Sequence, residues 1–294
     1  MKLTTDIFRE IKFLSIGQVT HDRYGDSICP GGCAYFGAKT ASGLGSQVKL
    51  LTSIGSDFEC DNFLIDLEVH GVREGFTTVF TNTYPDGDLR VQLVETQSPP
   101  ISFTHLPESW KSTDALFIAP VFEEIDASEP WLSGINSSTK SVSLQGFMKT
   151  SQGNDQKKLV VRGGDIREFD FPGVNAFFLS EEDIVLFGYP GFLEWLRATA
   201  DLVFVTQGEK GSIIYEGPKE YYASIYPVQN ALDPTGAGDT YAGAATLALS
   251  AGFNPIESAL LGASAASVVV EKLGSEGLEN ISEAFSRYNN TLPG

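Results

Sequence analysis

Short β-rich runs alternate with longer runs of small or amphipathic residues along most of the chain, and this alternation constrains the fold more than any other feature. It is typical of a mostly parallel sheet with helices on both faces. The chain has 294 residues, 42% of them hydrophobic, which is enough for a sizeable core. We therefore expect an α/β three-layer sandwich, formed as a single domain over residues 1–294. The expected parallel strands are 12–16, 48–54, 115–119, 140–144, 176–179 and 202–206.

Helical patterns fill the segments between these strands. The sequence predicts helices at 33–44, 57–70 and 181–200, the last broken in two by Gly188, Pro190 and Gly191. A further helix should begin after Asn254, because Pro255 and Glu257 complete a capping box, and should run to about residue 272.

The pattern changes between residues 76 and 103. Two alternating strands, 76–82 and 89–95, are joined by a turn-rich stretch, Tyr84-Pro-Asp-Gly-Asp. This predicts a small antiparallel excursion from the parallel sheet.

Charge and composition exclude several classes of function. The net charge of −18 argues against binding to nucleic acids or anionic membranes. No apolar run approaches the ~18 residues that span a bilayer, and residues 1–10 mix charges where a signal peptide needs an apolar core. We expect a soluble, cytoplasmic protein. Its three cysteines form no even framework and no zinc pattern, so we interpret them as structural or incidental thiols.

The most informative motif is residues 233–243, Asp-Pro-Thr-Gly-Ala-Gly-Asp-Thr-Tyr-Ala-Gly, which leads into a helix of small apolar residues. Gly236 and Gly238 let successive backbone amides converge on an anion, and the start of the helix adds unpaired amides and partial positive charge. One interpretation is phosphoryl transfer, with Asp239 as the general base. The other is an Asp that caps a helix after a tight turn.

Six specified positions of this motif should coincide by chance about once in 10⁷ positions. The segment resembles the Asp-x-x-Gly-Ala-Gly-Asp motif of the ribokinase or PfkB family of small-molecule kinases. The resemblance implies a ribokinase-like sandwich that uses ATP and Mg²⁺. It implies a catalytic site formed by Asp239 with the amides of Gly236, Ala237 and Gly238, and a monovalent cation such as K⁺ near Asp233.

Other segments follow the order of that family. Asp22 ends the segment after the first strand, where relatives bind sugar hydroxyls, and Gly31 and Gly32 match a double glycine beside the substrate. Phe36 stands where the family commonly has an Asn, which would make the pocket more apolar. The stretch Gly-Gly-Cys-Ala-Tyr-Phe is similar to inositol kinases, so myo-inositol is one expected substrate.

Two further segments match in part. Gln145 could reach the substrate from a strand end, and Lys149 is a candidate cation for phosphates. Ser180 and Asp183 fall where the family has Asn-x-x-Glu near Mg²⁺. Asp183 could hold the metal through water, although a plain helix cap explains both residues equally well.

The nucleotide would lie along the loop that contains Thr206, Gly208 and Gly211, although a bare β-turn would look similar. Its phosphates would also contact Thr235, Gly236 and Gly238. His21, beside Asp22, has either a route to the substrate or a structural hydrogen bond.

The sequence thus predicts an ATP-dependent kinase that phosphorylates an alcohol on a small sugar, polyol or nucleoside, as a monomer or homodimer. The alternative is a ligand sensor that keeps the fold without catalysis. Only eight residues separate Asp22 from Gly31. We therefore expect a reduced β-lid formed mainly by residues 76–104, with a short contribution from 22–30.

Overall fold

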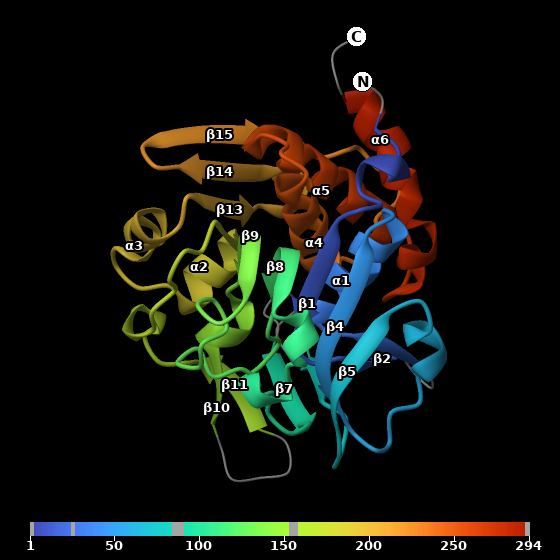
Figure 1. Ribbon diagram of the computed structural model, residues 1–294, viewed down its shortest axis with the longest axis vertical. Coiled ribbons are helices and arrows are strands. Elements are labelled where there is room, and N and C mark those ends of the chain that lie inside the picture. Colours follow the sequence, from blue (N-terminus) through green and yellow to red (C-terminus); the bar gives the residue numbers. More distant parts are fainter. Residues whose placement is uncertain (1–2, 25–26, 84–90, 153–157, 292–294) are drawn as a thin grey trace.

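The main sheet of the computed structural model has nine strands; the structure describes residues 3–24, 27–83, 91–152 and 158–291. The strands are β1 (Lys12–Ile16), β4 (Gln47–Ile54), β5 (Glu68–Arg73), β8 (Ser112–Ile118), β9 (Asn136–Ser143), β12 (Ala176–Ser180), β13 (Leu202–Thr206), β14 (Ser212–Glu216) and β15 (Lys219–Ala223). Their order is β15-β14-β13-β12-β9-β8-β1-β4-β5 (Figure 1). Pairings from β13 to β5 are parallel, and β14 and β15 add an antiparallel edge. This confirms the predicted mostly parallel sheet.

Helices cover both faces of this sheet and complete a three-layer sandwich. One face packs against α1 (Cys33–Gly43), α4 (Ala237–Ser250) and α5 (Pro255–Val269), with α6 (Ala284–Thr291) outside them. The other face packs against α3 (Phe192–Thr199), which follows α2 (Glu181–Phe187). Side chains alternate between the two cores because successive strand residues point to opposite faces: Phe178 joins the first core and Phe177 the second. None of the described helices combines the length and apolar character needed to cross a bilayer.

Short 3₁₀ helices occupy many of the connections. They are η1 (Thr5–Ile7), η2 (Asp61–Leu64), η3 (Phe103–His105), η4 (Glu108–Trp110), η5 (Gln145–Met148), η6 (Ile166–Glu168), η7 (Gly208–Lys210) and η8 (Glu276–Glu283).

Two helix predictions are confirmed in detail. The break in the 181–200 pattern falls between α2 and α3, where Gly188 ends one helix and Gly191, in the left-handed region at φ 76°, begins the next. At α5, Asn254 accepts the amide of Glu257 and the Glu257 carboxylate accepts the amide of Asn254, at 3.0 and 3.1 Å. This reciprocal pair is the predicted capping box.

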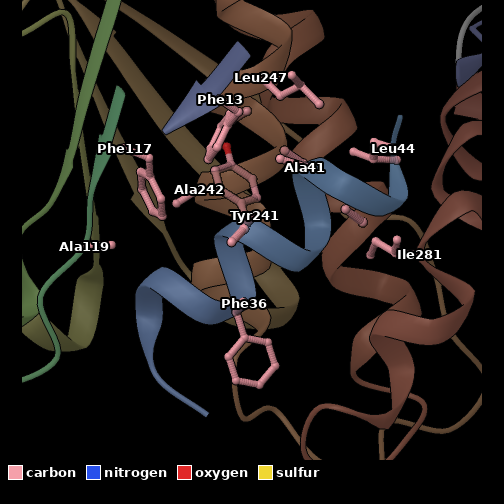
Figure 2. Close-up of a cluster of buried hydrophobic side chains, with 14 of the residues drawn as sticks. Phe13, Phe36, Ala41, Leu44, Phe117, Ala119, Tyr241, Ala242, Leu247 and Ile281 are labelled. Atoms are coloured by element: carbon pink, nitrogen blue, oxygen red, sulfur yellow. The ribbon is translucent and has the colours of Figure 1, made fainter. Parts of the chain in front are cut away.

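Helices α1 and α4 cross in close contact. A Cβ on Gly243 would lie 2.6 Å from the Cα atom of Gly37, so only glycines allow the two backbones to approach this closely. Figure 2 shows the buried side chains around this crossing, among them Phe117, Tyr241 and Ala242. The tight crossing fixes the start of α4 relative to α1, which matters for the site described below.

A second sheet has six strands in the order β10-β11-β7-β6-β2-β3. They are β2 (Thr20–Tyr24), β3 (Ser27–Gly31), β6 (Val79–Thr83), β7 (Val91–Thr96), β10 (Lys149–Gln152) and β11 (Lys158–Arg162). The predicted antiparallel pair is present as β6 and β7, and the predicted turn at 84–88 lies outside the described residues. The sequence analysis did not assign β10 and β11 to this sheet.

The predicted helix over residues 57–70 is wrong. This segment instead forms η2 and then the edge strand β5, which pairs with β4 in parallel from Glu68 to Arg73. Its helical pattern came from Phe58, Leu64 and Leu67, which are buried; Leu64 reaches the core from η2, and the other two from the residues before and after it. Gly71, interpreted as a helix end, lies within β5 at φ 140°. From residue 68 onward, pairing with β4 outweighed the helical pattern because it satisfies the backbone hydrogen-bonding groups there.

Candidate active site

The turn before α4 is fixed from two sides. The Asp233 carboxylate accepts the amides of Thr235 and Gly274, both at 2.9 Å, which ties the turn to the loop after α5. Gly236 is the N-cap of α4 and has φ 73°, in the left-handed region. A Cβ there would lie 2.2 Å from Cε1 of Phe36, so the ring of Phe36 packs directly against the turn.

This support changes the interpretation of Phe36. The sequence analysis placed the side chain in the substrate pocket, whereas the structure buries it, with 1% exposure, beneath Gly236. Figure 2 shows Phe36 extending from α1. The apolar residue at this position therefore shapes the glycine turn.

Backbone amides at the start of α4 are available to a ligand. Among the described residues, the amides of Gly236, Gly238 and Asp239 donate to no protein acceptor, while the amide of Ala237 donates to the carbonyl of Pro234 at 3.1 Å. Ala237 therefore leaves the predicted set of amides that would bind an anion, because its amide closes the turn. A Cβ on Gly238 would meet no atom within 4 Å, so the space beside this residue is open. Free amides and the helix dipole together favour an anion here.

The Asp239 carboxylate lies in the first turn of α4, half-buried beside these amides. Burial raises the pKa of Asp239 above its usual range, and the nearby Asp183 charge raises it further. The nearby Cys33 thiol and the positive charge of Lys149 act in the opposite direction. A raised pKa makes a carboxylate a stronger base.

Cys33 is a site residue that the sequence analysis missed. Its thiol is buried at the start of α1, where it donates to Oε1 of Gln145 at 3.7 Å and lies close enough to Asp239 to lower the pKa of that carboxyl group. Burial and the neighbouring carboxylate raise the pKa of the thiol well above its usual range, which keeps it protonated. Its position directly after Gly31-Gly32 was the sequence feature that could have identified Cys33 as a site residue. The structure thus brings together Asp239, Cys33 and Gln145 from three separate segments.

Asp22 lies close enough to interact with this group. Burial raises the pKa of Asp22 to about 6, and the charges of Asp239 and Asp233 contribute in the same direction. Thr20 opposes the shift by donating from Oγ1 to Oδ1 of Asp22 at 3.0 Å. A Cβ on Gly31 would lie 2.2 Å from Oδ2 of Asp22, so Gly31 leaves the space that this carboxylate occupies.

Gly32 has a separate backbone role. It is the N-cap of α1 at φ 98°, and a Cβ there would lie 2.4 Å from the carbonyl oxygen of Gln18. The double glycine therefore accommodates Asp22 at one residue and a sharp backbone turn at the next.

Lys149 is the first residue of β10 in the second sheet and is buried, with 5% exposure. Its Nζ atom lies 3.4 Å from Oε1 of Gln92, and its charge lowers the pKa of Asp239 and Cys33. A buried cation near the base fits its predicted role beside phosphates.

Asp183 and Ser180 form a helix cap. The amide and hydroxyl of Ser180 donate to Oδ2 of Asp183 at 2.9 and 2.7 Å, and the Asp183 amide donates back to the Ser180 hydroxyl at 3.0 Å. Within the described residues no three His, Cys, Asp or Glu side chains converge as metal ligands. A Mg²⁺ ion that accompanies a nucleotide needs only one or two carboxylates, since phosphates and water supply its other ligands. The donor set of Asp183 is compatible with that limited role.

The expected nucleotide loop joins β13 to β14 in a hairpin. The Gln207 amide donates to the Gly211 carbonyl at 2.8 Å, and Gly208 and Gly211 have φ 58° and 96°. Nε2 of Gln207 also donates to Glu181 at the start of α2, at 3.0 Å. Thr206 ends β13, next to the end of β12. The loop therefore lies at the carboxyl edge of the sheet, where α/β folds bind ligands.

His21 is structural. Its ring stacks on Phe58 at 5.1 Å, and its Nε2 accepts the amide of Glu59 at 3.4 Å. Burial lowers the pKa of His21, which favours the neutral ring.

A buried polar network joins the main sheet to the second sheet behind Asp22. Glu124 is fully buried and accepts the amides of Gln18, Val121 and Phe122 at 3.1, 2.7 and 2.6 Å. The side chain of Gln18 accepts the Thr78 hydroxyl at 2.6 Å. This network fixes the loop between β1 and β2. Asp22 lies in β2, directly after this loop, so the network also holds Asp22 toward the site.

Solved structures with similar architecture define the fold. A pyrophosphate-dependent kinase of the ribokinase family, in a sulfate complex, has TM-score 0.75 at 23% identity over 92% of this chain and 99% of that one. A related structure with a pyrophosphate analog and myo-inositol has TM-score 0.72 at 22% identity over 92% and 99%. The chain therefore has a ribokinase-like fold.

Sequence comparison finds related kinases. Residues 173–280 match the model of the pfkB family carbohydrate kinases. A cytidine kinase of Thermococcus kodakarensis is 27% identical over 83% of this chain and 89% of its own length, and a ribokinase of Bacillus subtilis is 26% identical over 84% and 83%. Just over a third of the chain thus matches the pfkB family model, and most of its length is similar to kinases that act on carbohydrates or nucleosides.

Proposed function

We propose that this kinase transfers the γ-phosphoryl group of ATP to an alcohol of a small sugar, polyol or nucleoside, with Asp239 as general base. The observation that carries the proposal is the position of the Asp239 carboxylate beside the free amides of Gly236 and Gly238, within electrostatic reach of Asp22. A helix cap alone would need neither the open anion site nor the second buried carboxylate.

In the proposed step, the acceptor hydroxyl attacks the γ-phosphorus and its proton passes to Asp239. The bond from that phosphorus to the bridging oxygen breaks, ADP leaves, and a phosphate monoester forms. The amides of Gly236 and Gly238 bind the equatorial oxygens, where negative charge spreads in the transition state. The buried ammonium of Lys149 adds positive charge on the side of the second sheet.

The acceptor would lie between the ends of the two sheets. Asp22 can accept hydrogen bonds from two neighbouring hydroxyls, which suits a polyol or a ribose. Gly31 leaves room for this carboxylate, and Gln145 offers an amide beside Cys33. The second sheet serves as the lid in this proposal, and it extends the expected 76–104 and 22–30 segments with β10 and β11.

Nucleotide phosphates would reach the α4 turn from the β13–β14 loop, with Thr206, Gly208, Gly211 and Thr235 along their path. Mg²⁺ would supply charge neutralisation between the phosphates, with Asp183 as its nearest carboxylate. Both oxygens of Asp233 bind backbone amides, so the proposed K⁺ site there would share a carboxylate that already holds the turn.

Names of similar proteins define the substrates to test. A panel of cytidine, ribose and myo-inositol, each with ATP or pyrophosphate as donor, covers the acceptors and donors of those relatives. Formation of a phosphate monoester, detected by mass spectrometry, is the expected result for at least one pair. The use of Asp183 in a helix cap favours the alternative, a non-catalytic sensor. Calorimetric binding of a panel compound without product would establish the sensor and refute the kinase proposal.

A further inference from the structure

Three chain connections between the main sheet and the second sheet meet at the side chain of Gln18. This side chain is fully buried, in the loop from β1 to β2. Its Nε2 donates to the carbonyls of Ser98 and Pro99, which follow β7, at 3.1 and 3.0 Å. Its Oε1 accepts the hydroxyl of Thr78, which precedes β6, at 2.6 Å. One side chain therefore holds together the segments that enter β2, enter β6 and leave β7.

The backbone of Gln18 is held from the side of the main sheet. Its amide donates at 3.1 Å to Glu124, a fully buried carboxylate in the loop after β8. A Cβ on Gly32 would lie 2.4 Å from the Gln18 carbonyl oxygen, so the start of α1 packs directly against the same residue. Gln18 is thus fixed both to the loop after β8 and to the helix that carries Cys33.

Thr78 extends this network to the strand that carries Asp22. Its hydroxyl accepts the amide of Ser98 at 2.9 Å, and its carbonyl accepts the amide of His21, the residue before Asp22, also at 2.9 Å. The Thr78 side chain is fully buried. Buried polar networks in which the groups are satisfied make the surrounding backbone rigid. Strand β2 is therefore held next to Asp22 by Thr78 and at its start by the loop that contains Gln18.

We propose that Gln18 and Thr78 are positioning residues that set the place of the Asp22 carboxylate and thereby the affinity for the acceptor. This inference rests on the proposed function, in which Asp22 binds the acceptor hydroxyls. Both side chains are fully buried, so they act through Asp22 and not by contact with the acceptor. Two hydroxyls must meet one carboxylate in a fixed geometry, so a shift of β2 weakens acceptor binding.

Calorimetric titration of the full chain with cytidine, ribose and myo-inositol tests the proposal. Thr78→Val keeps the shape of the side chain but removes the hydroxyl, and it should weaken acceptor binding roughly two- to thirty-fold. Thr78→Ser keeps the hydroxyl and should bind within about twofold of the natural protein. Equal acceptor affinities of Thr78→Val and the natural protein would overturn the proposal.

A double-mutant cycle shows whether Thr78 acts through Asp22. In the Asp22→Asn background, Thr78→Val should change the affinity for the acceptor by less than about twofold. Effects of the two changes that simply multiply would overturn the proposal. Asn175→Ala is the control for lost stability: Asn175 accepts the amide of Lys140 at 2.8 Å and donates to Asp201 at 2.9 Å, at the amino edge of the main sheet. This variant should bind the acceptor like the natural protein.

Amide hydrogen exchange of the ligand-free protein tests the positioning without any acceptor. The amides of β2 should exchange faster in Thr78→Val than in Thr78→Ser, because a broken network lets β2 open more often. Unchanged exchange of β2 in Thr78→Val would refute the inference. If Thr78→Val does not fold, Ser98→Ala removes the hydroxyl that accepts the Thr78 amide at 3.1 Å and should have the same effects.

Failure of the proposed function has a different signature. Absence of a phosphorylated product from the natural protein refutes the kinase activity. The binding cycle and the exchange of β2 stay interpretable in that case, because neither measurement depends on turnover.

Discussion

Substitution of Gly236 tests how the anion-binding turn is held. Gly236→Ala places a Cβ 2.2 Å from the Phe36 ring in a residue at φ 73°. The left-handed conformation costs an L-residue about 1–2 kcal/mol, and forcing an extra methyl group into a packed core costs about 1–3 kcal/mol. The two effects are separate, so we expect the free energy of unfolding to fall by about 2–5 kcal/mol.

Urea denaturation, followed by circular dichroism, measures this change. Phe36→Leu supplies the second arm of a double-mutant cycle, because it removes the ring edge and leaves the backbone angle unchanged. The double variant should recover about 1–3 kcal/mol relative to the sum of the single changes. Gly238→Ala is the matched control: this residue is helical and its Cβ would meet open space, so its stability should stay equal or rise by up to about 1 kcal/mol. A Gly236→Ala variant within 0.5 kcal/mol of the natural protein, or a loss that Phe36→Leu does not reduce, would refute this account of the turn.

Three other substitutions probe neighbouring residues. Because the folded pKa of Asp22 is raised to about 6, the native state holds more protons than the unfolded state between about pH 4 and 6, and stability falls as pH rises through that window. Asp22→Asn should therefore stabilise the ligand-free protein at pH 7 by about 1–3 kcal/mol, and this gain should disappear below about pH 4; unfolding measured at a series of pH values tests it. The same variant should raise the KM for the acceptor, which an acceptor titration measures. Cys33→Ala removes a thiol that lowers the pKa of Asp239, so the acid limb of the pH–rate profile should move to higher pH. An unchanged profile would show that the thiol does not act on the base. Asn254→Ala removes the α5 cap and should cost about 1 kcal/mol of stability in thermal denaturation with kcat retained; a loss of kcat in folded protein would contradict a purely structural cap.

Local patterns in the sequence predicted most of the main sheet and its helices. The strands from 12–16 to 202–206 and the capping box at Asn254 follow from neighbouring residues, which is why they were predicted correctly. The helix expected at 57–70 failed because pairing of β5 with β4 depends on a partner strand that periodicity does not reveal.

The site shows the same difference between features set by neighbouring residues, which were predicted, and contacts between distant segments, which were not. The motif at 233–243 identified Asp239 and the glycine turn, since the residues that form it are adjacent in the chain. The contacts of Cys33 with Asp239 and Gln145, and the support of Gly236 by Phe36, join segments that are distant in sequence. A single sequence does not show which of these side chains meet.

The most direct test of the central claim is the turnover of Asp239→Asn with the acceptor and donor identified by the substrate panel. Burial already raises the pKa of this carboxyl group, so a neutral amide of similar shape should leave the free energy of unfolding equal or higher. If Asp239 is the base, kcat should fall by roughly 10² to 10⁴. Near-normal turnover by the folded variant would contradict the account.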